Sequence, residues 1–153
     1  NITGTPSPEV NLPDTAGKDV SLYAVQAPYT LVVIYDPTCG HCKETLPSVD
    51  SIYTKKWKAA GVKIFAMAKE TSGTKKNWTD FIAEHKLQAW HHVYCTKKTE
   101  EERIKGNIPS YSQLFDVLTF PTLYLLDKDK KIIAKKLTYL QMDEIMNYRT
   151  KGQ

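Results

Sequence analysis

The sequence has 153 residues, 41% hydrophobic and 25% charged, which is enough for one compact domain with its own core. Its 21 basic and 17 acidic residues give a net charge of +4 spread along the chain, which is too mild and too dispersed to indicate nucleic-acid or membrane binding. No apolar run approaches the roughly 20 residues of a membrane-spanning helix. The chain starts at Asn1 with neither an initiator Met nor a signal peptide, so we expect a processed or excised domain.

Strand and helix patterns alternate along the first half of the chain. Residues 1–18 are proline-rich and polar, and predict an irregular lead-in with a short hairpin near residues 14–17. Residues 30–35 form a β-branched, apolar run typical of a strand buried on both faces. A helix is expected over residues 40–60, with Pro47 inside it as a kink and Gly61 at its end.

The second half continues the alternation. We expect a strand at 62–68, a helix at 74–87, a strand at 89–95, a short helix at 110–116, strands at 120–126 and 131–136, and a helix at 141–149. Residues 96–109 are charged and polar, and predict a loop or a helical insertion. The pattern predicts one α/β domain over residues 1–153, layered around a largely parallel sheet.

The motif Cys39-Gly40-His41-Cys42 directly follows the first predicted strand and opens the long helix. The free N–H groups and the positive dipole end of a helix N-terminus stabilise an anion, so a cysteine there is favoured as the reactive thiolate. We predict a redox-active dithiol in which the exposed Cys39 attacks and Cys42, one turn further on, resolves the mixed disulfide. A protonated His41 would add positive charge near the Cys39 sulfur.

Other uses of the C-x-x-C spacing fit less well. A structural zinc site needs four ligands, and the residues that could complete one are His85, His91, His92 and Cys95. His91 and His92 are adjacent in a predicted strand, so their side chains should point to opposite faces. Haem attachment needs a histidine after the second cysteine, where this chain has Lys43. A static disulfide over so short a loop would add little stability. We therefore expect no metal and no cofactor.

Thr119-Phe120-Pro121-Thr122 opens a predicted buried strand. A proline at this position suggests a cis Phe120–Pro121 peptide bond, and a trans proline at the first strand position is the alternative. A C-x-x-C motif earlier in an α/β pattern favours the cis bond.

These residues together resemble the thioredoxin superfamily. The resemblance covers about residues 8–148 and is closest to the TlpA/ResA-like branch, whose extra helix and strand would match residues 74–95. The stretch I-Y-D-P-T-C-G-H-C-K is similar to thioredoxin-like domains of secreted or lipid-anchored Bacteroidetes proteins. The resemblance implies a thioredoxin-like three-layer sandwich, with a mixed central sheet, helices on both faces and the TlpA-like helix–strand insertion.

The resemblance also implies a thiol–disulfide exchanger outside the cytoplasm, in the periplasm or cell envelope, with Pro121 as a cis-proline beside the dithiol. In such folds the backbone before this proline pairs with a bound peptide, so Thr38, Phe120 and Pro121 are expected to bind substrate. The implied partners are protein dithiols or disulfides and an upstream redox partner. The domain is expected to be monomeric, and is compatible with a longer or lipid-anchored chain.

The active-site sequence departs from the family pattern. Gly40-His41 is like the dipeptide of protein disulfide isomerase, which suggests a potential nearer about −180 mV than the about −270 mV of thioredoxin. Thr38 replaces the tryptophan that commonly precedes the first cysteine. The proton-accepting carboxylates of thioredoxin and of TlpA-like proteins fall on Val33 and Thr45. The nearest carboxylates in sequence, each expected at the surface, are Glu44, Asp36 and Glu70.

Cys95 ends the third predicted strand. If the 62–68 strand lies between it and the first, two inter-strand steps place Cys95 roughly 10 Å from the dithiol. It is either a relay or regulatory thiol, or an unpaired cysteine that packs in the core, which is the commoner case. The aromatic side chains expected to line the groove beside the dithiol are Tyr35, Phe120 and Tyr111.

The sequence thus predicts an enzyme that exchanges disulfides with protein substrates. A peroxiredoxin-like thiol peroxidase is one alternative, but the Pro-x-x-x-Thr/Ser-x-x-Cys loop is missing because Val32 or Tyr35 stands where its proline is needed. A non-catalytic binding module is another, against which the two intact cysteines and Pro121 argue.

Overall fold

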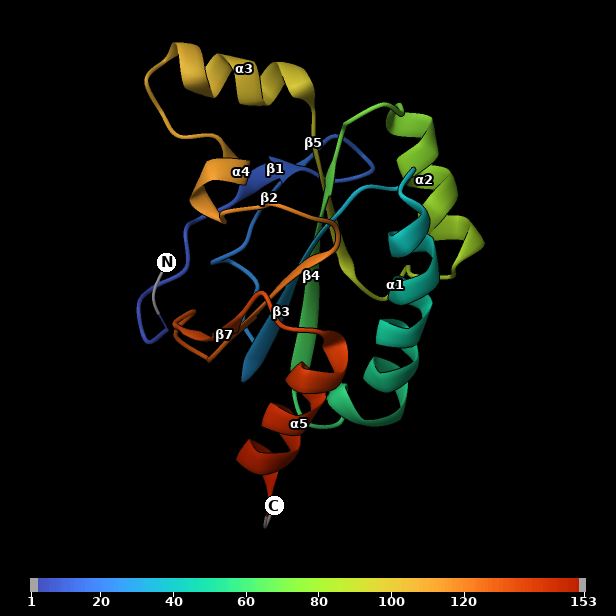
Figure 1. Ribbon diagram of the computed structural model, residues 1–153, viewed down its shortest axis with the longest axis vertical. Coiled ribbons are helices and arrows are strands. Elements are labelled where there is room, and N and C mark those ends of the chain that lie inside the picture. Colours follow the sequence, from blue (N-terminus) through green and yellow to red (C-terminus); the bar gives the residue numbers. More distant parts are fainter. Residues whose placement is uncertain (1–2, 152–153) are drawn as a thin grey trace.

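The computed structural model describes residues 3–151, and within them a five-stranded sheet has the order β5-β4-β3-β6-β7 (Figure 1). Its strands are β3 (Tyr29–Tyr35), β4 (Val62–Lys69), β5 (His91–Cys95), β6 (Thr122–Leu126) and β7 (Ile132–Lys135). β3, β4 and β5 are parallel, whereas β6 is antiparallel to both β3 and β7. The mixed sheet confirms the implied fold class and corrects the largely parallel sheet expected from the alternation, because the tight β6–β7 hairpin can join only antiparallel strands.

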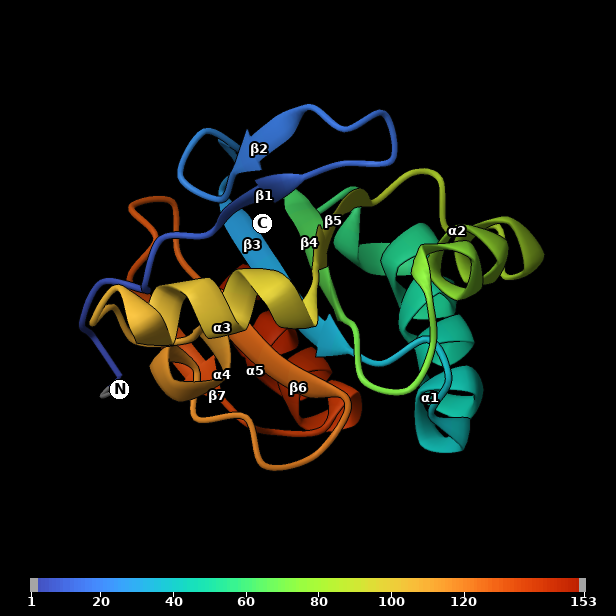
Figure 2. The same cartoon turned by 90° about the horizontal axis from the view of Figure 1, so that it is seen from above.

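Helices and a hairpin cover the two faces of this sheet (Figure 2). One face packs against α1 (Gly40–Ile52), a π-helical turn η1 (Tyr53–Trp57), α2 (Lys75–Glu84) and α5 (Tyr139–Thr150). The other packs against α4 (Tyr111–Leu114) and the hairpin of β1 (Asn11–Pro13) and β2 (Asp19–Ser21). The predicted lead-in hairpin is confirmed, and it forms part of the third layer.

Two segments differ in detail from the expectation. Residues 96–109 contain a helix, α3 (Lys97–Lys105), which begins where the Thr96 hydroxyl accepts a hydrogen bond from the Thr99 amide at 3.0 Å. The long helix predicted over residues 40–60 changes to π-helical hydrogen bonding after Ile52, with Pro47 inside its α-helical part. Gly61 follows it with φ +91°, a left-handed conformation that favours glycine.

β3 positions the candidate site. Its residues from Leu31 to Tyr35 are all buried, as expected for a central strand. Val32 and Ile34 face the hairpin side, whereas Val33 and Tyr35 face the α1–α2 side. The chain then leaves the sheet and enters α1 directly, so the first turn of α1 lies at the end of the sheet. No helix within residues 3–151 is long and apolar enough to cross a membrane.

Candidate active site

Cys39 lies at the N-terminal cap of α1. Its backbone is extended, with φ −81° and ψ 127°, and its amide donates to the Asp36 carbonyl at 3.0 Å. The thiol is half-buried and, within the described part of the chain, makes no capping hydrogen bond through its side chain. The free N–H groups of the first turn are therefore available to a thiolate at this position.

Cys42 lies one turn further along α1 and is completely buried. The pKa of its thiol is raised to about 12, chiefly by burial; a hydrogen bond with the Asp36 backbone opposes this rise, whereas the Cys39 thiol and the Asp36 carboxylate contribute to it. All three cysteines of the chain, Cys39, Cys42 and Cys95, are free thiols in the structure. The dithiol therefore pairs an accessible sulfur at a helix N-terminus with a buried one that keeps its proton.

Asp36 is buried, with 8% of its surface exposed, and not at the surface as expected. One carboxylate oxygen accepts hydrogen bonds from the Thr38 amide at 2.8 Å and the Thr38 hydroxyl at 2.7 Å, and the other accepts from the Thr71 hydroxyl. These bonds replace the lost hydration of the carboxylate and join the loop before Cys39 to the loop after β4. The hydrogen bond from the Thr38 amide to the Asp36 carboxylate forms an Asx-turn, which the sequence Asp-Pro-Thr could have indicated.

The other sequence candidates near the dithiol are more exposed. Glu44 and His41 are exposed on α1, and a side chain at Gly40 would meet no described atom within 4 Å. Glu70 is half-buried and accepts hydrogen bonds from the Tyr94 hydroxyl and the Lys97 amide. The surface beside the dithiol is thus open to a large substrate.

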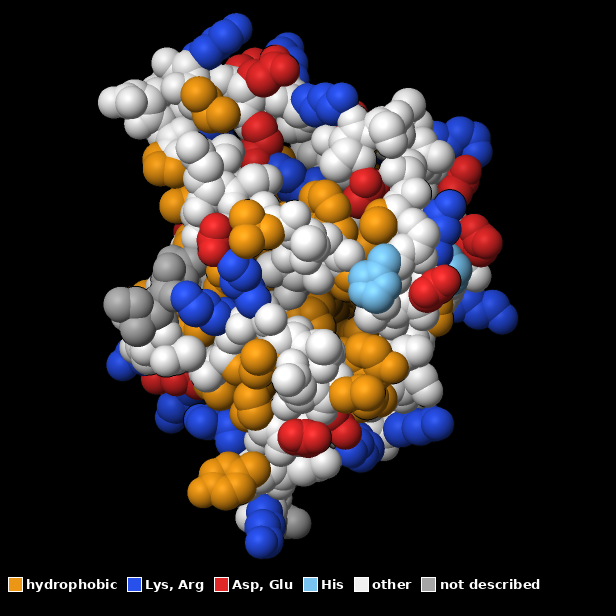
Figure 3. Space-filling view, in the orientation of Figure 1, with side chains coloured by type: hydrophobic (Ala, Val, Ile, Leu, Met, Phe, Trp, Pro, Cys, Tyr) orange, Lys and Arg blue, Asp and Glu red, His pale blue; other side chains and the backbone are white. Residues whose placement is uncertain are grey.

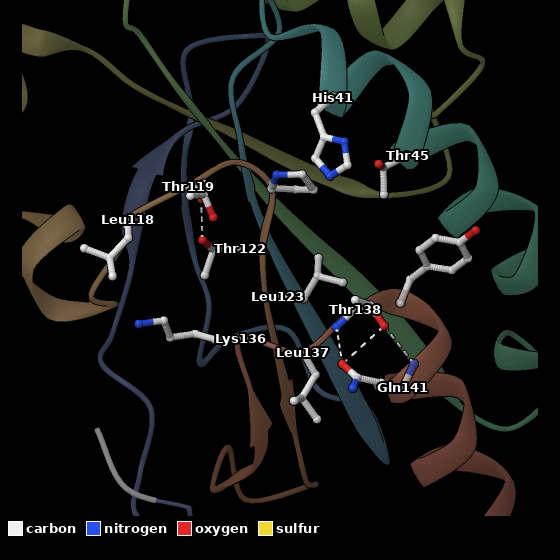
Figure 4. Close-up of a pocket in the computed structure, with 12 residues that line it drawn as sticks. His41, Thr45, Leu118, Thr119, Thr122, Leu123, Lys136, Leu137, Thr138 and Gln141 are labelled. Atoms are coloured by element: carbon white, nitrogen blue, oxygen red, sulfur yellow. Dashed lines mark hydrogen bonds between the residues drawn. The ribbon is translucent and has the colours of Figure 1, made fainter.

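A groove of about 450 Å³ runs beside the first turn of α1 (Figure 4). Its walls are the α1 start, the segment before and into β6, and the turn from β7 into α5; its lining residues are His41, Thr45, Leu118, Thr119, Pro121, Thr122, Leu123, Lys136, Leu137, Thr138, Tyr139 and Gln141. The Phe120–Pro121 peptide bond is cis, as predicted. In the space-filling view, hydrophobic side chains surround a hollow on this face, with a histidine at its edge (Figure 3).

The groove contains only part of the predicted substrate-binding set. Pro121 lines it, whereas Thr38 lines a separate small pocket between the loop before α1 and the loop after β4, and Phe120 packs against the core. The expectation that Tyr35 and Tyr111 line the groove is wrong. Tyr35 is fully buried because its β3 position faces α1 and α2. Tyr111, the first residue of α4, packs into the core on the hairpin face, and its hydroxyl donates to the Asn11 carbonyl oxygen.

Residues 3–149 match the family model described as the AhpC/TSA family. The chain belongs to this family. A solved domain of a possible thiol–disulfide isomerase from Cytophaga hutchinsonii is 30% identical; the match covers 99% of this chain and 95% of that one, with a TM-score of 0.81. The thiol–disulfide oxidoreductase ResA of Bacillus cereus is 27% identical over 149 residues, which are 97% of this chain and 77% of ResA.

A third relative shares the fold. The thioredoxin domain of a thiol–disulfide oxidoreductase from Bacteroides vulgatus is 24% identical, with a TM-score of 0.76 over 96% of this chain and 99% of that domain. These matches confirm the thioredoxin-like fold and the resemblance to ResA and to Bacteroidetes domains. This member of the AhpC/TSA family is a thioredoxin-like oxidoreductase.

Cys95 lies away from the dithiol in this AhpC/TSA-family chain. β4 separates β5 from β3 as expected, but Cys95 belongs to the core cluster on the hairpin face, across the sheet from Cys42. Lys69 donates to its sulfur at 3.5 Å and forms a buried ion pair with Glu100. The geometry favours a packed thiol over a relay: side chains alternate between the two faces of a strand, and Cys95 points to the hairpin face of the sheet, away from Cys42.

The histidines considered as zinc ligands do not converge. His91 is half-buried and His92 is buried, with its Nε2 atom 2.6 Å from the Leu87 carbonyl oxygen. The His85 ring packs against Phe81 in a tilted arrangement. Within residues 3–151, no three His, Cys, Asp or Glu side chains are grouped as a metal ion would need.

Proposed function

We propose that this protein exchanges disulfides with protein substrates through the Cys39–Cys42 dithiol, with Cys39 attacking and Cys42 resolving. The observation that carries this proposal is the contrast between the two sulfurs. Cys39 is accessible at the N-terminus of α1, while Cys42 is buried behind it with a pKa raised to about 12 by burial. An accessible anion site suits the nucleophile, and a protonated neighbour suits a thiol that waits for the mixed disulfide.

The proposed reaction has two steps. The Cys39 thiolate attacks a substrate disulfide, forms a mixed disulfide and releases one substrate sulfur as a thiolate. Cys42 then loses its proton and attacks the Cys39 sulfur, so that a Cys39–Cys42 disulfide forms and the second substrate sulfur leaves with the electron pair. The two released substrate sulfurs take up protons, and the substrate is reduced by two electrons while the dithiol is oxidised. The reverse sequence would oxidise a substrate dithiol.

Asp36 is the carboxylate that best supports proton transfer from Cys42. It is buried and its charge acts on the Cys42 thiol, whereas Glu44 is exposed on α1. We assign His41 to the neighbourhood of the Cys39 sulfur, where a protonated imidazole would favour the thiolate.

We assign the groove beside the dithiol to the substrate chain. Its walls are largely apolar, and Thr119 and Pro121 line it on both sides of Phe120. An extended peptide pairing with the backbone of this segment would bring a substrate cysteine to Cys39. The family resemblance supports a place outside the cytoplasm, where protein disulfides persist, and an upstream redox partner that resets the dithiol.

Insulin reduction tests the proposal. We expect the protein to accelerate reduction of insulin disulfides, Cys39→Ser to abolish this acceleration, and Cys95→Ser, a matched change across the sheet, to retain it. Undiminished activity of Cys39→Ser would overturn the proposal. Consumption of hydrogen peroxide by the dithiol in place of insulin reduction would instead favour a thiol peroxidase.

The redox equilibrium of the Cys39–Cys42 pair against glutathione gives the direction of electron flow. The Gly40-His41 dipeptide leads us to expect a couple less reducing than thioredoxin. A value near that of thioredoxin, about −270 mV, would contradict this expectation.

A further inference from the structure

Resolution requires a thiolate at Cys42, in a part of the core where burial opposes charge. The carboxylates that serve related proteins at this step fall on Val33 and Thr45 in this chain. Asp36 contributes a negative charge that acts against the Cys42 thiolate. A hydrogen-bond donor directed at the sulfur would offset both effects, because donors to a charged acceptor favour the charged form.

Tyr35 supplies a hydroxyl in the same core. It is fully buried on the face of β3 that packs against α1 and α2, in one cluster with Cys42, Trp78 and Phe81. Its ring packs on Phe81 with the ring centres 5.1 Å apart, and the Trp78 ring stacks on Tyr94 with centres 4.8 Å apart. Trp78, Phe81 and Tyr94 belong to the α2–β5 insertion, so this insertion helps to enclose the Tyr35 side chain in the cluster that contains Cys42.

Two polar atoms in this enclosure are unsatisfied. Among residues 3–151, neither the Tyr35 hydroxyl nor the Trp78 indole nitrogen has a hydrogen-bond partner of standard geometry, although both are buried. Such groups are rare in a core, because an unpaired buried donor costs free energy. The Tyr35 hydroxyl, in largely apolar surroundings, therefore lacks a hydrogen-bond partner among the described residues while Cys39 and Cys42 are both free thiols.

The surroundings give the hydroxyl a direction. The Trp78 indole can only donate, so it cannot accept the Tyr35 proton, which is left for another acceptor. Burial and the nearby Cys42 sulfur both raise the pKa of Tyr35, so the phenol keeps its proton. The ionisable groups that act on the pKa of Cys42 are Cys39 and Asp36.

We propose that the Tyr35 hydroxyl donates a hydrogen bond to the Cys42 thiolate during resolution, with the Trp78 indole behind it. Tyr35 is thus a positioning and stabilising residue for the second step, and the α2–β5 insertion contributes to the chemistry through Trp78. No proton is transferred to Tyr35: the proton of Cys42 leaves by another route and reaches the departing substrate sulfur. The proposal rests on the roles proposed above for Cys39 and Cys42.

Stopped-flow reaction with Ellman's reagent separates the two steps. In a Cys95→Ser background, attack by Cys39 releases a first nitrothiobenzoate ion, and resolution by Cys42 releases a second. We expect Tyr35→Phe to slow the second phase about tenfold at neutral pH and to shift its pH profile to higher pH, while the first phase is unchanged. Tyr94→Phe is the matched control, because it removes a hydroxyl of the same aromatic group that is bonded to Glu70; both phases should keep their rates.

Stability separates a chemical role from a structural one. Tyr35→Phe removes an unsatisfied hydroxyl and leaves the ring, so its unfolding midpoint in urea should equal or exceed that of the parent protein. An unchanged second phase in Tyr35→Phe, or an equal slowing of both phases, would overturn the proposal. Failure of the first phase in the Cys95→Ser parent itself would instead overturn the proposed function.

Discussion

Asp36 is close enough to Cys42 to influence its pKa, and its two possible effects on resolution oppose each other. As a negative charge, Asp36 raises the pKa of Cys42; as a proton acceptor, it would help Cys42 to ionise. Its hydrogen bonds to Thr38 and Thr71 hold the carboxylate in place for either role. Removing its charge while keeping its shape distinguishes the two.

Asp36→Asn is expected to slow resolution about a hundredfold at neutral pH, as the loss of a general base would. The second phase of the reaction with Ellman's reagent measures this step. Glu44→Gln, a change of the same kind on the exposed face of α1, should have no effect. A faster second phase in Asp36→Asn would show that Asp36 acts on Cys42 only through its charge.

Leu118 is an apolar side chain placed for contact with substrate. It lines the groove and is 77% exposed, far more than a side chain that serves the core. We expect Leu118→Ser to raise the KM for a protein substrate several-fold, a loss of about 1 kcal/mol in binding, with little change in kcat. Leu140→Ser, on α5 and outside the groove lining, is the control at 57% exposure; an equal rise in its KM would argue against the groove.

At the scale of elements, the loop after β4 and the loop before α1 interlock. The Thr38 hydroxyl lies 3.3 Å from that of Ser72, and a Cβ atom at Gly73 would lie 2.5 Å from the Thr38 methyl carbon. The close approach requires glycine at position 73. The backbone of the residue before Cys39 therefore depends on a loop that belongs to the β4–α2 connection.

Gly73→Ala is expected to displace Thr38, and with it Cys39, and to lower insulin-reduction activity about tenfold, with a stability loss of about 1–3 kcal/mol. Adding Thr38→Ser removes the clashing methyl group and keeps the hydroxyl that bonds to Asp36. The double variant should regain part of the activity, since the contact of the new Cβ with the Asn77 side chain remains. No recovery would show that the Asn77 contact alone accounts for the loss.

Local sequence patterns were sufficient to predict the elements whose residues are uniformly apolar. The run from Leu31 to Tyr35 predicted β3, and the cysteine spacing after it predicted the dithiol at the helix start. The facing of side chains was harder, because it depends on pairing partners far away in the sequence. Tyr35 was misplaced for this reason, because the face it takes follows from the order and register of β3, β4 and β6. The same uncertainty left Cys95 with two interpretations, of which the packed thiol is the one that the structure favours.

Burial of polar groups was the other limit. Asp36 follows a strand and precedes a proline, a setting that is usually exposed, and its burial depends on donors from Thr38 and the distant Thr71. α3 was open to two interpretations because its sequence is polar apart from Ile104 and no α3 residue is buried. It is held against the fold by Glu100, which bonds Lys69 and the Tyr111 amide.

At the scale of the whole molecule, buried histidines make stability depend on pH. Burial lowers the pKa of His92, although its Leu87 hydrogen bond opposes this, and burial with the nearby Lys63 lowers the pKa of His91. In the unfolded chain both histidines have a pKa of about 6.5. Below that pH the unfolded state binds protons that the folded state takes up less readily. The stability they contribute is therefore complete above about pH 6.5 and is lost as the pH falls towards their folded pKa values.

We therefore expect the free energy of unfolding in urea to be lower at pH 5.5 than at pH 7.5. His92→Gln should reduce this difference, because a glutamine amide can still donate to the Leu87 carbonyl but does not titrate. His85→Gln is the comparison, since His85 is half-buried at the C-terminal cap of α2 and, in the part of the chain that the structure describes, lacks a buried hydrogen bond like that of His92; it should leave the difference as it is. An undiminished pH dependence in His92→Gln would assign the acid sensitivity to other groups, with His91 the first to test by the same substitution.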